Sequence, residues 1–293
     1  MPDPAPIVDS LGHVATRQQL TAAGCSGFDL TIAVRRATIW RVRQARYVTP
    51  GASSDAIAAA RVGGMLAGPS AARSYGLWSG FDRRLHVSIG ANSSRLRTNF
   101  APSLDPARLT PDFSDREVVL HWLVEGAVPE LGPECWRVSL GTCLRQMVSW
   151  SDRETALACL DTARTTFGLS TAALLEVLRD SPFAERLLVC ASRDGSDAGS
   201  ESVVRQRLAS EGISVIQQVQ FPGMRVDMQV VGTTVLIEVA GEEFHGSVEA
   251  QERDRRRDET LAALGYSVVR LSFDRVFGDW PWCLRQIRDA LAS

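Results

Sequence analysis

The pattern of hydrophobic and polar positions divides the chain into three stretches, and the first of these, residues 1–50, predicts two short helices and a hairpin. Thr16 and Gln19 have the spacing of a capping box at a helix N-terminus, and so do Ser26 and Asp29 further on. Residues 39–48 alternate in the way that a small β-hairpin does. The first stretch is therefore predicted to be a helix-turn-helix followed by a wing-like hairpin.

The middle stretch, residues 51–192, predicts helices and strands without a catalytic constellation. Apolar periodicity indicates helices at Asp152–Phe167 and Ser170–Arg179, and a strand at Leu85–Ile89. His86 and His121 each stand alone among apolar neighbours. A histidine in that setting is more often a packed, hydrogen-bonded core residue than a ligand.

The third stretch, residues 198–293, follows a run of linker composition and has an α/β pattern. The predicted elements are a helix at 200–210, strands at 213–220, 225–231 and 234–240, a helix at 249–264, a strand at 266–272 and a helix at 282–291. Gly232 suits the turn between the second and third strands, and Gly265 suits the end of the long helix. The sequence thus predicts a multidomain α/β protein with parts at 1–50, 51–192 and 198–293.

Composition describes a globular protein and adds one unusual feature. The 293 residues are 45% hydrophobic and 23% charged, with a formal net charge of -2. The chain contains no lysine, so every basic side chain is an arginine. GC-rich coding is the simplest explanation of that bias, yet it also means that no reaction here can use an amine side chain.

The chain shows no targeting signal, and we expect it to be cytoplasmic. Its start lacks a basic region followed by an apolar one, and no apolar run is long enough to span a membrane. The six cysteines form no C-x-x-C pair and no zinc-type cluster, so we expect reduced, mostly buried thiols.

A local basic field coincides with the predicted hairpin. No acidic residue occurs from Leu30 to Ser54. Neutralising DNA phosphates releases counterions, so such a field suits DNA binding, although a run of charge is also compatible with a solvated arginine face. The candidate DNA-binding residues are Arg35, Arg36, Arg41, Arg43 and Arg46.

Two carboxylates mark the third stretch as the site of chemistry. Asp227 and Glu238 lie on neighbouring predicted strands joined by a tight turn, which can bring them side by side. Two such groups repel each other unless one is protonated or a cation lies between them, and Mg²⁺ or Mn²⁺ suits oxygen ligands. Glu238 shares its strand face with Leu236 and Ala240. The alternative is an ion pair between Glu238 and a nearby arginine.

Four further residues support this pair. On the helix predicted from 249, Asp254 and Arg257 share a stripe with Leu261 and are expected over one end of the sheet. His245 follows the glutamate strand and could accept a proton from an attacking water. Glu201 lies on a core-facing side of the helix predicted at 200–210.

The segments RVDMQVVGTTVLIEVAGEEFH and ERDRRRDETLAALGYSVVRLS resemble the very-short-patch-repair (Vsr) endonuclease-like branch of the PD-(D/E)XK nuclease superfamily. The resemblance covers about residues 198–291 and implies a restriction-endonuclease-like fold. It makes Asp227, Glu238 and His245 the matching catalytic positions, with Glu201, Asp254, Arg257 and Asp258 as supporting matches. One departure matters: the lysine that usually follows the glutamate by two positions is Ala240.

The front of the chain is similar to a second family. The segments HVATRQQLTAAG, RVRQARYVTP and MLAGPSAARSYGL resemble the winged-helix N-terminus of AbiEi-type antitoxins from toxin-antitoxin systems, over about residues 10–180. This likeness implies a DNA-binding module. The position at the wing turn that is commonly glycine is Ala45 here.

The leading hypothesis is a cytoplasmic protein that binds double-stranded DNA and hydrolyses its phosphodiesters, with Mg²⁺ or Mn²⁺ held by Asp227 and Glu238 and with His245 and Arg257 assisting. The rival is a non-enzymatic antitoxin-like regulator with an inactive nuclease-type domain, which Ala240 favours. An RNA-directed nuclease is a third hypothesis without an aromatic base-stacking platform to support it. The second resemblance implies a protein partner of the toxin-antitoxin type, and the sequence leaves the oligomeric state, target and pathway open.

Overall fold

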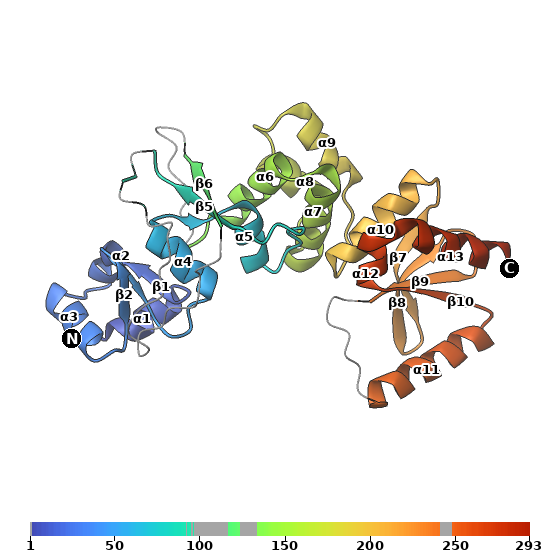
Figure 1. Ribbon diagram of the computed structural model, residues 1–293, viewed down its shortest axis with the longest axis horizontal. Coiled ribbons are helices and arrows are strands. Elements are labelled where there is room, and N and C mark those ends of the chain that lie inside the picture. The colour runs from blue at the N-terminus through green and yellow to red at the C-terminus, as the bar shows by residue number, and fades with distance from the viewer. Residues whose placement is uncertain (1, 92, 95, 97–116, 124–133, 241–247) are drawn as a thin grey trace. The chain divides into compact units, whose positions relative to one another are not determined.

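The computed structural model describes residues 2–91, 93–94, 96, 117–123, 134–240 and 248–293, the side chains of 248–254 excepted. The chain forms two compact units, Met1–Trp150 and Ser151–Ser293 (Figure 1). The predicted linker at 193–199 lies within the second unit, between α9 (Phe183–Ala191) and α10 (Gly199–Ser210). The three-part domain division stays a prediction.

The first unit begins with the predicted helix-turn-helix and hairpin. Both capping boxes are confirmed, because Thr16 and Gln19, and likewise Ser26 and Asp29, exchange side-chain and backbone hydrogen bonds. The three strands form an antiparallel sheet in the order β1-β3-β2. The elements are α1 (Pro4–Ser10), β1 (Val14–Thr16), α2 (Arg17–Ala22), α3 (Gly27–Arg35), β2 (Trp40–Arg43) and β3 (Arg46–Val48).

The rest of the first unit surrounds a second small sheet. Its strands lie in the order β4-β5-β6, and β5 and β6 run parallel. The strand predicted at Leu85–Ile89 is confirmed and buried throughout. The elements are α4 (Ser54–Val62), β4 (Met65–Leu66), α5 (Gly68–Ser74), β5 (Leu85–Ile89), β6 (Val118–Trp122) and α6 (Leu140–Trp150).

The two histidines of this sheet are packed and hydrogen-bonded, as expected from sequence, and they also contact each other. His86 Nδ1 lies 3.0 Å from His121 Nε2, and His86 Nε2 lies 3.0 Å from an oxygen of Asp82. The ring of His121 stacks on Trp150 with 3.8 Å between the centroids. The sequence could not show this, because the parallel register of β5 and β6 brings together two residues that lie far apart in the chain.

The second unit opens with three helices, of which α7 packs against α10 through buried charge. Asp161 on α7 is fully buried and accepts hydrogen bonds from Ser202 and Arg205 on α10. Glu154 on α7 accepts two from Arg207, each at 2.7 Å. The helices are α7 (Arg153–Phe167), α8 (Thr171–Val177) and α9, and the predicted helices at 152–167 and 170–179 correspond to the first two.

The remainder of the second unit is a four-stranded sheet with helices on both faces (Figure 1). The strand order is β10-β9-β8-β7, with β10 parallel to β9 and the other pairs antiparallel. α11 covers one face, and α10 and α13 lie on the other. The elements after α10 are β7 (Val215–Phe221), β8 (Met224–Val230), β9 (Val235–Val239), α11 (Val248–Ala263), β10 (Ser267–Leu271), α12 (Phe273–Gly278) and α13 (Trp280–Ala292).

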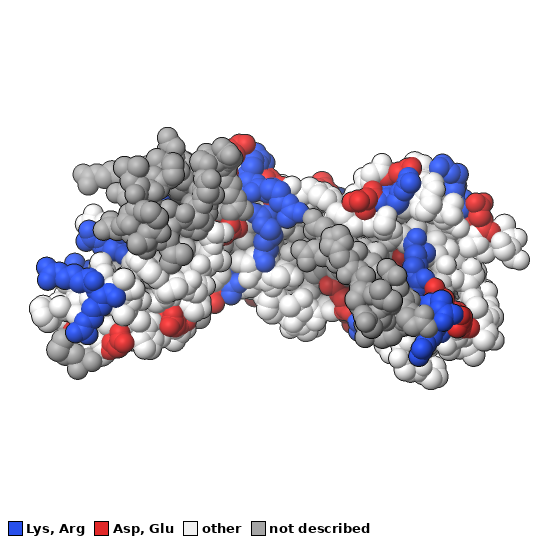
Figure 2. Space-filling view, turned by 60° about the horizontal axis from the view of Figure 1, so that its bottom comes forward, with Lys and Arg blue, Asp and Glu red and all other residues white. Residues whose placement is uncertain are grey.

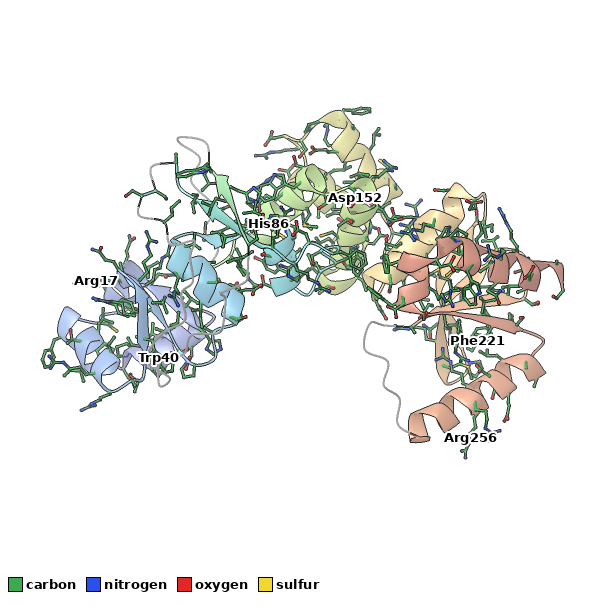
Figure 3. The ribbon with its side chains drawn as sticks, in the orientation of Figure 1. Arg17, Trp40, His86, Asp152, Phe221 and Arg256 are labelled. Carbon is green, nitrogen blue, oxygen red and sulfur yellow. The ribbon has the colours of Figure 1, made fainter. Side chains whose placement is uncertain are left out.

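An apolar cluster fixes α11 to its face of the sheet. Leu261 of α11 is fully buried against Val226 and Leu236, and Phe221 packs between the sheet and α11 (Figure 3). Among the described members of the predicted stripe, Arg257 and Leu261 face the sheet, but Leu264 is 55% exposed, because α11 ends at Ala263. α11 is thereby held so that its preceding turns lie along the Glu238 side of the sheet.

The structure also bears on membrane-spanning helices and on the cysteines. Within the residues that the structure describes, no helix is long and apolar enough to cross a membrane. All six cysteines are described and none of them forms a disulfide; five are buried and Cys190 is exposed.

Candidate functional site

The site begins where two neighbouring strands separate, a place we call the fork. The β8–β9 ladder pairs Gln229 with Leu236 and Met228 with Ile237, and stops there. One position further on, the carboxylate of Asp227 accepts a hydrogen bond of 2.8 Å from the backbone N–H of Val239. The side chain thus satisfies a strand amide that a neighbouring backbone carbonyl would otherwise take. This contact fixes the orientation of Asp227 beside Glu238.

A distortion on the other side of β8 adds a third carboxylate. The β7–β8 ladder pairs Gln217 with Met228 and Val219 with Val226, but omits Gln218, whose φ of 53° is rare for a residue with a side chain. The Gln218 amide instead donates to Glu201 Oε2 at 3.1 Å. The backbone N–H of Asp197 donates to the same oxygen. The kink in β7 therefore ties the sheet to the buried carboxyl group on α10.

Two arginines hold Glu238, one from each neighbouring element. Arg257 Nη2 on α11 lies 2.5 Å from Glu238 Oε1, and Arg270 Nε on β10 lies 3.2 Å from Glu238 Oε2. Arg270 is the register partner of Glu238 across the parallel β9–β10 pair, and its remaining nitrogens bind Asp258. The ion pair that sequence analysis weighed as an alternative is thus present, with two arginines rather than one.

Negative charge exceeds positive charge in this cluster. Arg225 of β8 forms a further ion pair with Asp197, and Arg257 donates to the backbone carbonyl of Arg225. Among the described residues, five carboxyl groups face three guanidinium groups. The carboxyl groups belong to Asp197, Glu201, Asp227, Glu238 and Asp258, and the guanidinium groups to Arg225, Arg257 and Arg270. The arrangement therefore suits an added cation.

The titration behaviour of the three central carboxyl groups agrees with that excess. Burial, reinforced by the negative charge of Asp227, raises the pKa of Glu201 to about 7. Burial also raises the pKa of Asp227, although the N–H of Val239 and the charge of Arg257 oppose the shift. The pKa of Glu238 is likewise raised by burial, against the attraction of Arg257 and Arg270. All three groups would gain from a nearby cation, because a cation stabilises their charged forms.

The residues present fit a divalent metal ion such as Mg²⁺ or Mn²⁺. Glu238 Oε1 is buried, and within the described part of the chain no donor has hydrogen-bond geometry toward it despite the close ion pair with Arg257. The described residues contain no group of three or more histidine, cysteine, aspartate or glutamate side chains placed to hold a metal. Mg²⁺ commonly binds through one or two carboxylates together with water and substrate phosphates, so Asp227 and Glu238 suffice as protein ligands.

Most of the positions predicted from sequence meet at this site. The structure brings together Asp227, Glu238, Arg257, Glu201 and Asp258. His245 lies outside the described residues, as does the side chain of Asp254, whose backbone is in α11. At the position of the missing lysine, Ala240 donates its backbone N–H to the carbonyl of Leu271.

Sequence reasoning missed Arg270, Gln218, Arg225 and Asp197. Arg270 had a signal, because it is the one charge in the apolar run SVVRL, and it shares the face of Glu238 once β10 is placed beside β9. Gln218 had none, because a kink within a strand is not visible in residue type. Arg225 and Asp197 lie in separate elements that only the fold brings together.

The N-terminal arginines fall into two groups. Arg35, Arg36 and Arg41 are exposed, and basic side chains gather at the N-terminal end of the molecule in the space-filling view (Figure 2). Arg43 is half-buried and donates to the carbonyls of Arg61 and Val62 at the end of α4. Arg46 donates to the carbonyl of Cys135. The predicted DNA-binding set therefore contains three exposed side chains and two that also hold the fold together.

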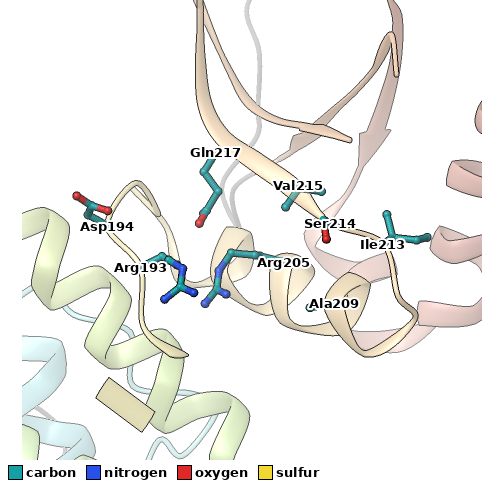
Figure 4. A pocket seen from close by; sticks show the side chains of 8 residues that line it. All are labelled: Arg193, Asp194, Arg205, Ala209, Ile213, Ser214, Val215 and Gln217. Carbon is teal, nitrogen blue, oxygen red and sulfur yellow. The ribbon is translucent and has the colours of Figure 1, made fainter. Parts of the chain in front are cut away.

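A separate pocket of about 420 Å³ lies against α10 and the start of β7 (Figure 4). Arg193 and Arg205 line it together with Gln217 and several apolar side chains. Arg205 is ion-paired with the buried Asp161, and Arg193 donates to backbone carbonyls. Arg205 thus takes part in the contact between α7 and α10, and Arg193 binds the C-terminal end of α9. None of the carboxyl groups of the candidate site lines the pocket.

Comparison with known proteins places this geometry in a family context. The model of a restriction-endonuclease-like family, REase_MTES_1575, matches residues 201–291. The C-terminal domain therefore has a restriction-endonuclease-like fold. The matched stretch, which is less than half of the chain, begins at Glu201 and contains every central residue of the site. A family match of this kind indicates a nuclease-type domain.

The catalytic domain of the homing endonuclease I-Bth0305I is a solved structure similar to part of the chain, at 22% identity and a TM-score of 0.28. The alignment covers 32% of this chain and 93% of that domain. A search of curated proteins finds no match to this chain.

Proposed function

We propose that the nuclease-type domain hydrolyses DNA phosphodiesters as a Mg²⁺- or Mn²⁺-dependent endonuclease. One observation carries the proposal: Glu201, Asp227 and Glu238 lie near the fork of a restriction-endonuclease-like sheet, and their pKa values are raised. In addition, Glu238 Oε1 accepts no hydrogen bond from the described residues. Clustered carboxyl groups are unfavourable without a cation, and such clusters typically mark functional sites. The Vsr-like resemblance supports the same proposal.

The side chains divide the work as follows. Asp227 and Glu238 would hold the metal ion, which when bound activates a water molecule and offsets charge on the phosphate. The N–H of Val239 orients Asp227, and Arg270 steadies Glu238 from the neighbouring strand. Glu201 has a pKa near neutrality, so it can accept or release a proton at cellular pH.

Ala240 leaves the place of the superfamily lysine without a charged group, and Arg257 is the nearest described replacement. Its guanidinium lies beside Glu238, and its charge lowers the pKa of Asp227 against the effect of burial. A guanidinium stays protonated in proteins, so Arg257 can compensate negative charge but cannot act as a base. We assign any protein-mediated deprotonation to Glu201 or to His245, the latter from sequence alone.

The second candidate function is a non-enzymatic, antitoxin-like regulator. Two observations favour it: the lysine is absent, and two arginines pair with Glu238 in the place where a cation would bind. In that case the nuclease-type domain would contribute DNA or partner binding only. A toxin-like protein partner belongs to this second proposal.

For the first unit we propose double-stranded DNA binding through the winged helix-turn-helix. Arg35, Arg36 and Arg41 are exposed basic side chains at the C-terminal end of α3 and on the hairpin, and no acidic residue occurs from Leu30 to Ser54. Phosphate contacts by arginines supply affinity without regard to sequence. Arg43 and Arg46 would support the module through their contacts with backbone carbonyls.

The deciding experiment measures Mg²⁺-dependent cleavage of supercoiled, mismatched and single-stranded DNA by the full chain. We expect Glu238→Gln to abolish cleavage and Glu259→Gln to leave it unchanged. Glu259 is the matched control because it is an exposed glutamate of α11 that pairs with Arg255, outside the cluster. Absence of cleavage by the wild type on all three substrates, with metal binding intact, would favour the regulator instead.

A further inference from the structure

The two arginines that contact Glu238 are held in different ways. Arg270 binds Asp258 through both terminal nitrogens and Glu238 through Nε, so it is fixed by two carboxylates. Each of these contacts comes from a neighbouring element of the sheet or from α11. Arg270 is therefore expected to keep its position if Glu238 binds a different cation.

Arg257 is held much less completely. Its Nη2 contacts both Glu238 Oε1 and the carbonyl of Arg225, while its Nε is buried with no hydrogen-bond acceptor among the described residues. The side chain is 29% exposed, whereas that of Glu238 is 13% exposed. A guanidinium with an unsatisfied donor in a partly buried place is an incomplete interaction, because the buried N–H has lost its water.

The same carboxylate oxygen is the point of conflict. Glu238 Oε1 is the atom that Arg257 approaches, and it is also the atom without a well-directed donor. A divalent cation shared by Asp227 and Glu238 would need an oxygen of Glu238 as a ligand. The charge of Arg257 already acts on both of these carboxyl groups. Two cations in one partly buried place repel, so the metal ion and Arg257 compete.

We propose that Arg257 is an exchangeable counter-ion of Glu238: a divalent cation displaces its guanidinium, which then binds a backbone phosphate of the nucleic acid. This inference rests on the proposed metal-dependent nuclease function. The planar fork of a guanidinium suits a phosphate, and a phosphate would also give the unsatisfied Nε an acceptor. Arg270 stays with Asp258 throughout, so Glu238 keeps its position during the exchange.

The exchange makes metal and nucleic acid bind cooperatively. Without DNA, the metal ion must break the Arg257–Glu238 ion pair, which weakens its affinity. With DNA present, the released guanidinium gains a phosphate partner, so metal binding becomes tighter. By linkage the metal raises DNA affinity by the same factor, which for coupled sites is typically about 5–150-fold.

The test measures Mn²⁺ affinity of the full chain by calorimetry, with and without a short phosphorothioate duplex that resists cleavage. In the absence of DNA, we expect Arg257→Ala and the longer, polar Arg257→Gln to bind Mn²⁺ about 10-fold more tightly than the wild type. The duplex should raise Mn²⁺ affinity in the wild type by a clearly larger factor than in either variant, where only direct contact of a DNA phosphate with the metal ion remains. Arg256→Ala is the matched control, because Arg256 is exposed and points away from the sheet (Figure 3).

The outcomes separate the inference from the function on which it rests. If the wild type binds Mn²⁺ and Glu238→Gln does not, the metal site stands. Unchanged or weaker Mn²⁺ binding by both Arg257 variants would then overturn the exchange, as would duplex coupling as large in them as in the wild type. If the wild type binds no Mn²⁺ with or without DNA, the proposed metal-dependent function itself fails.

Discussion

The arginines near Glu238 and those near the N-terminal hairpin both lie in arginine-rich stretches of sequence, but the first contact carboxylates and the second face solvent. Arg257 and Arg270 each form an ion pair with the carboxylate of Glu238. At the end of α3 and on the hairpin, Arg35 and Arg41 are exposed in the stretch from Leu30 to Ser54, which has no acidic residue. The first group therefore acts by balancing buried charge, and the second by presenting charge to solvent. An arginine-rich run alone does not distinguish the two, since only the fold decides which acids lie nearby.

The largest expected effect concerns buried charge at the α7–α10 contact. Asp161 is fully buried and accepts hydrogen bonds from Arg205, Ser202 and the backbone of Arg193. Asp161→Ala should lower the free energy of unfolding by about 3–5 kcal/mol, because Arg205 would be left without its counter-charge. Urea denaturation measures the change.

The control for that substitution is Asp180→Ala. Asp180 is 86% exposed and pairs with Arg179 on the surface. Its loss should change the free energy of unfolding by no more than about 0.5 kcal/mol. Similar effects at the two positions would mean that burial does not decide the value of these ion pairs.

The next effect is a pH dependence that comes from Glu201. Its pKa is raised from 4.5 to about 7 in the folded chain, so the folded state binds the proton more tightly than the unfolded state. The resulting stabilisation is fully present below pH 4.5 and is lost as the pH rises through about 7. In EDTA, Glu201→Gln should remove this decline, which amounts to roughly 3 kcal/mol at 1.36 kcal/mol per pKa unit.

Measuring unfolding free energies at pH 5 and pH 8 for the wild type and Glu201→Gln checks this directly. The difference between the two proteins should grow in favour of the variant as the pH rises. An identical pH dependence in both would show that Glu201 titrates in the folded state as it does when unfolded.

A third effect separates the two groups of N-terminal arginines. Replacing Arg35, Arg36 and Arg41 together with alanine should weaken binding to duplex DNA and make it less sensitive to salt. The logarithmic salt slope should fall by about 0.9 for each phosphate that the variant no longer neutralises. Stability should stay within about 0.5 kcal/mol of the wild type. Fluorescence anisotropy at several salt concentrations measures the DNA affinity, and urea denaturation measures the stability.

Arg43→Ala provides the contrast. Arg43 donates to two carbonyls at the C-terminal end of α4, so its loss should lower the free energy of unfolding by about 1.5–3 kcal/mol. A triple variant that unfolds more easily than Arg43→Ala would reverse our assignment of the exposed and structural arginines.

The smallest effect is at the hairpin turn. Ala45 has a φ of 59°, a conformation that is unfavourable for a residue with a Cβ and open to glycine. Ala45→Gly should raise the melting temperature by about 1–2 °C, since relief of strain slightly exceeds the added flexibility of the unfolded chain. Ala23→Gly, at a C-cap with a φ of -82°, should lower the melting temperature instead.

The success of sequence reasoning followed the range of the interactions. The capping boxes at Thr16 and Ser26 depend on residues three positions apart, and both were predicted. The proximity of Asp227 and Glu238 could also be predicted from sequence, because a tight hairpin and the two-residue period of strands place them together. Local pattern and side-chain parity were enough for the fold class and for the central carboxylates.

The remaining features depend on long-range packing. Arg270 meets Glu238 only because β10 lies parallel to β9, and a parallel neighbour cannot be deduced from a hairpin. The structural role of Arg43 required the position of α4, and the kink at Gln218 required a backbone angle. Residue type carries no information about these positions until the chain is folded.

The hydrogen bond at the fork allows the orientation of Asp227 to be followed at the backbone amide of Val239. The Val239 N–H is held by a carboxylate rather than by a carbonyl of the ladder. Its exchange with solvent deuterium therefore depends on whether Asp227 keeps that acceptor oriented toward it, whereas neighbouring ladder amides report the opening of the sheet. Hydrogen–deuterium exchange at this one amide would follow a side chain that carries no convenient label of its own.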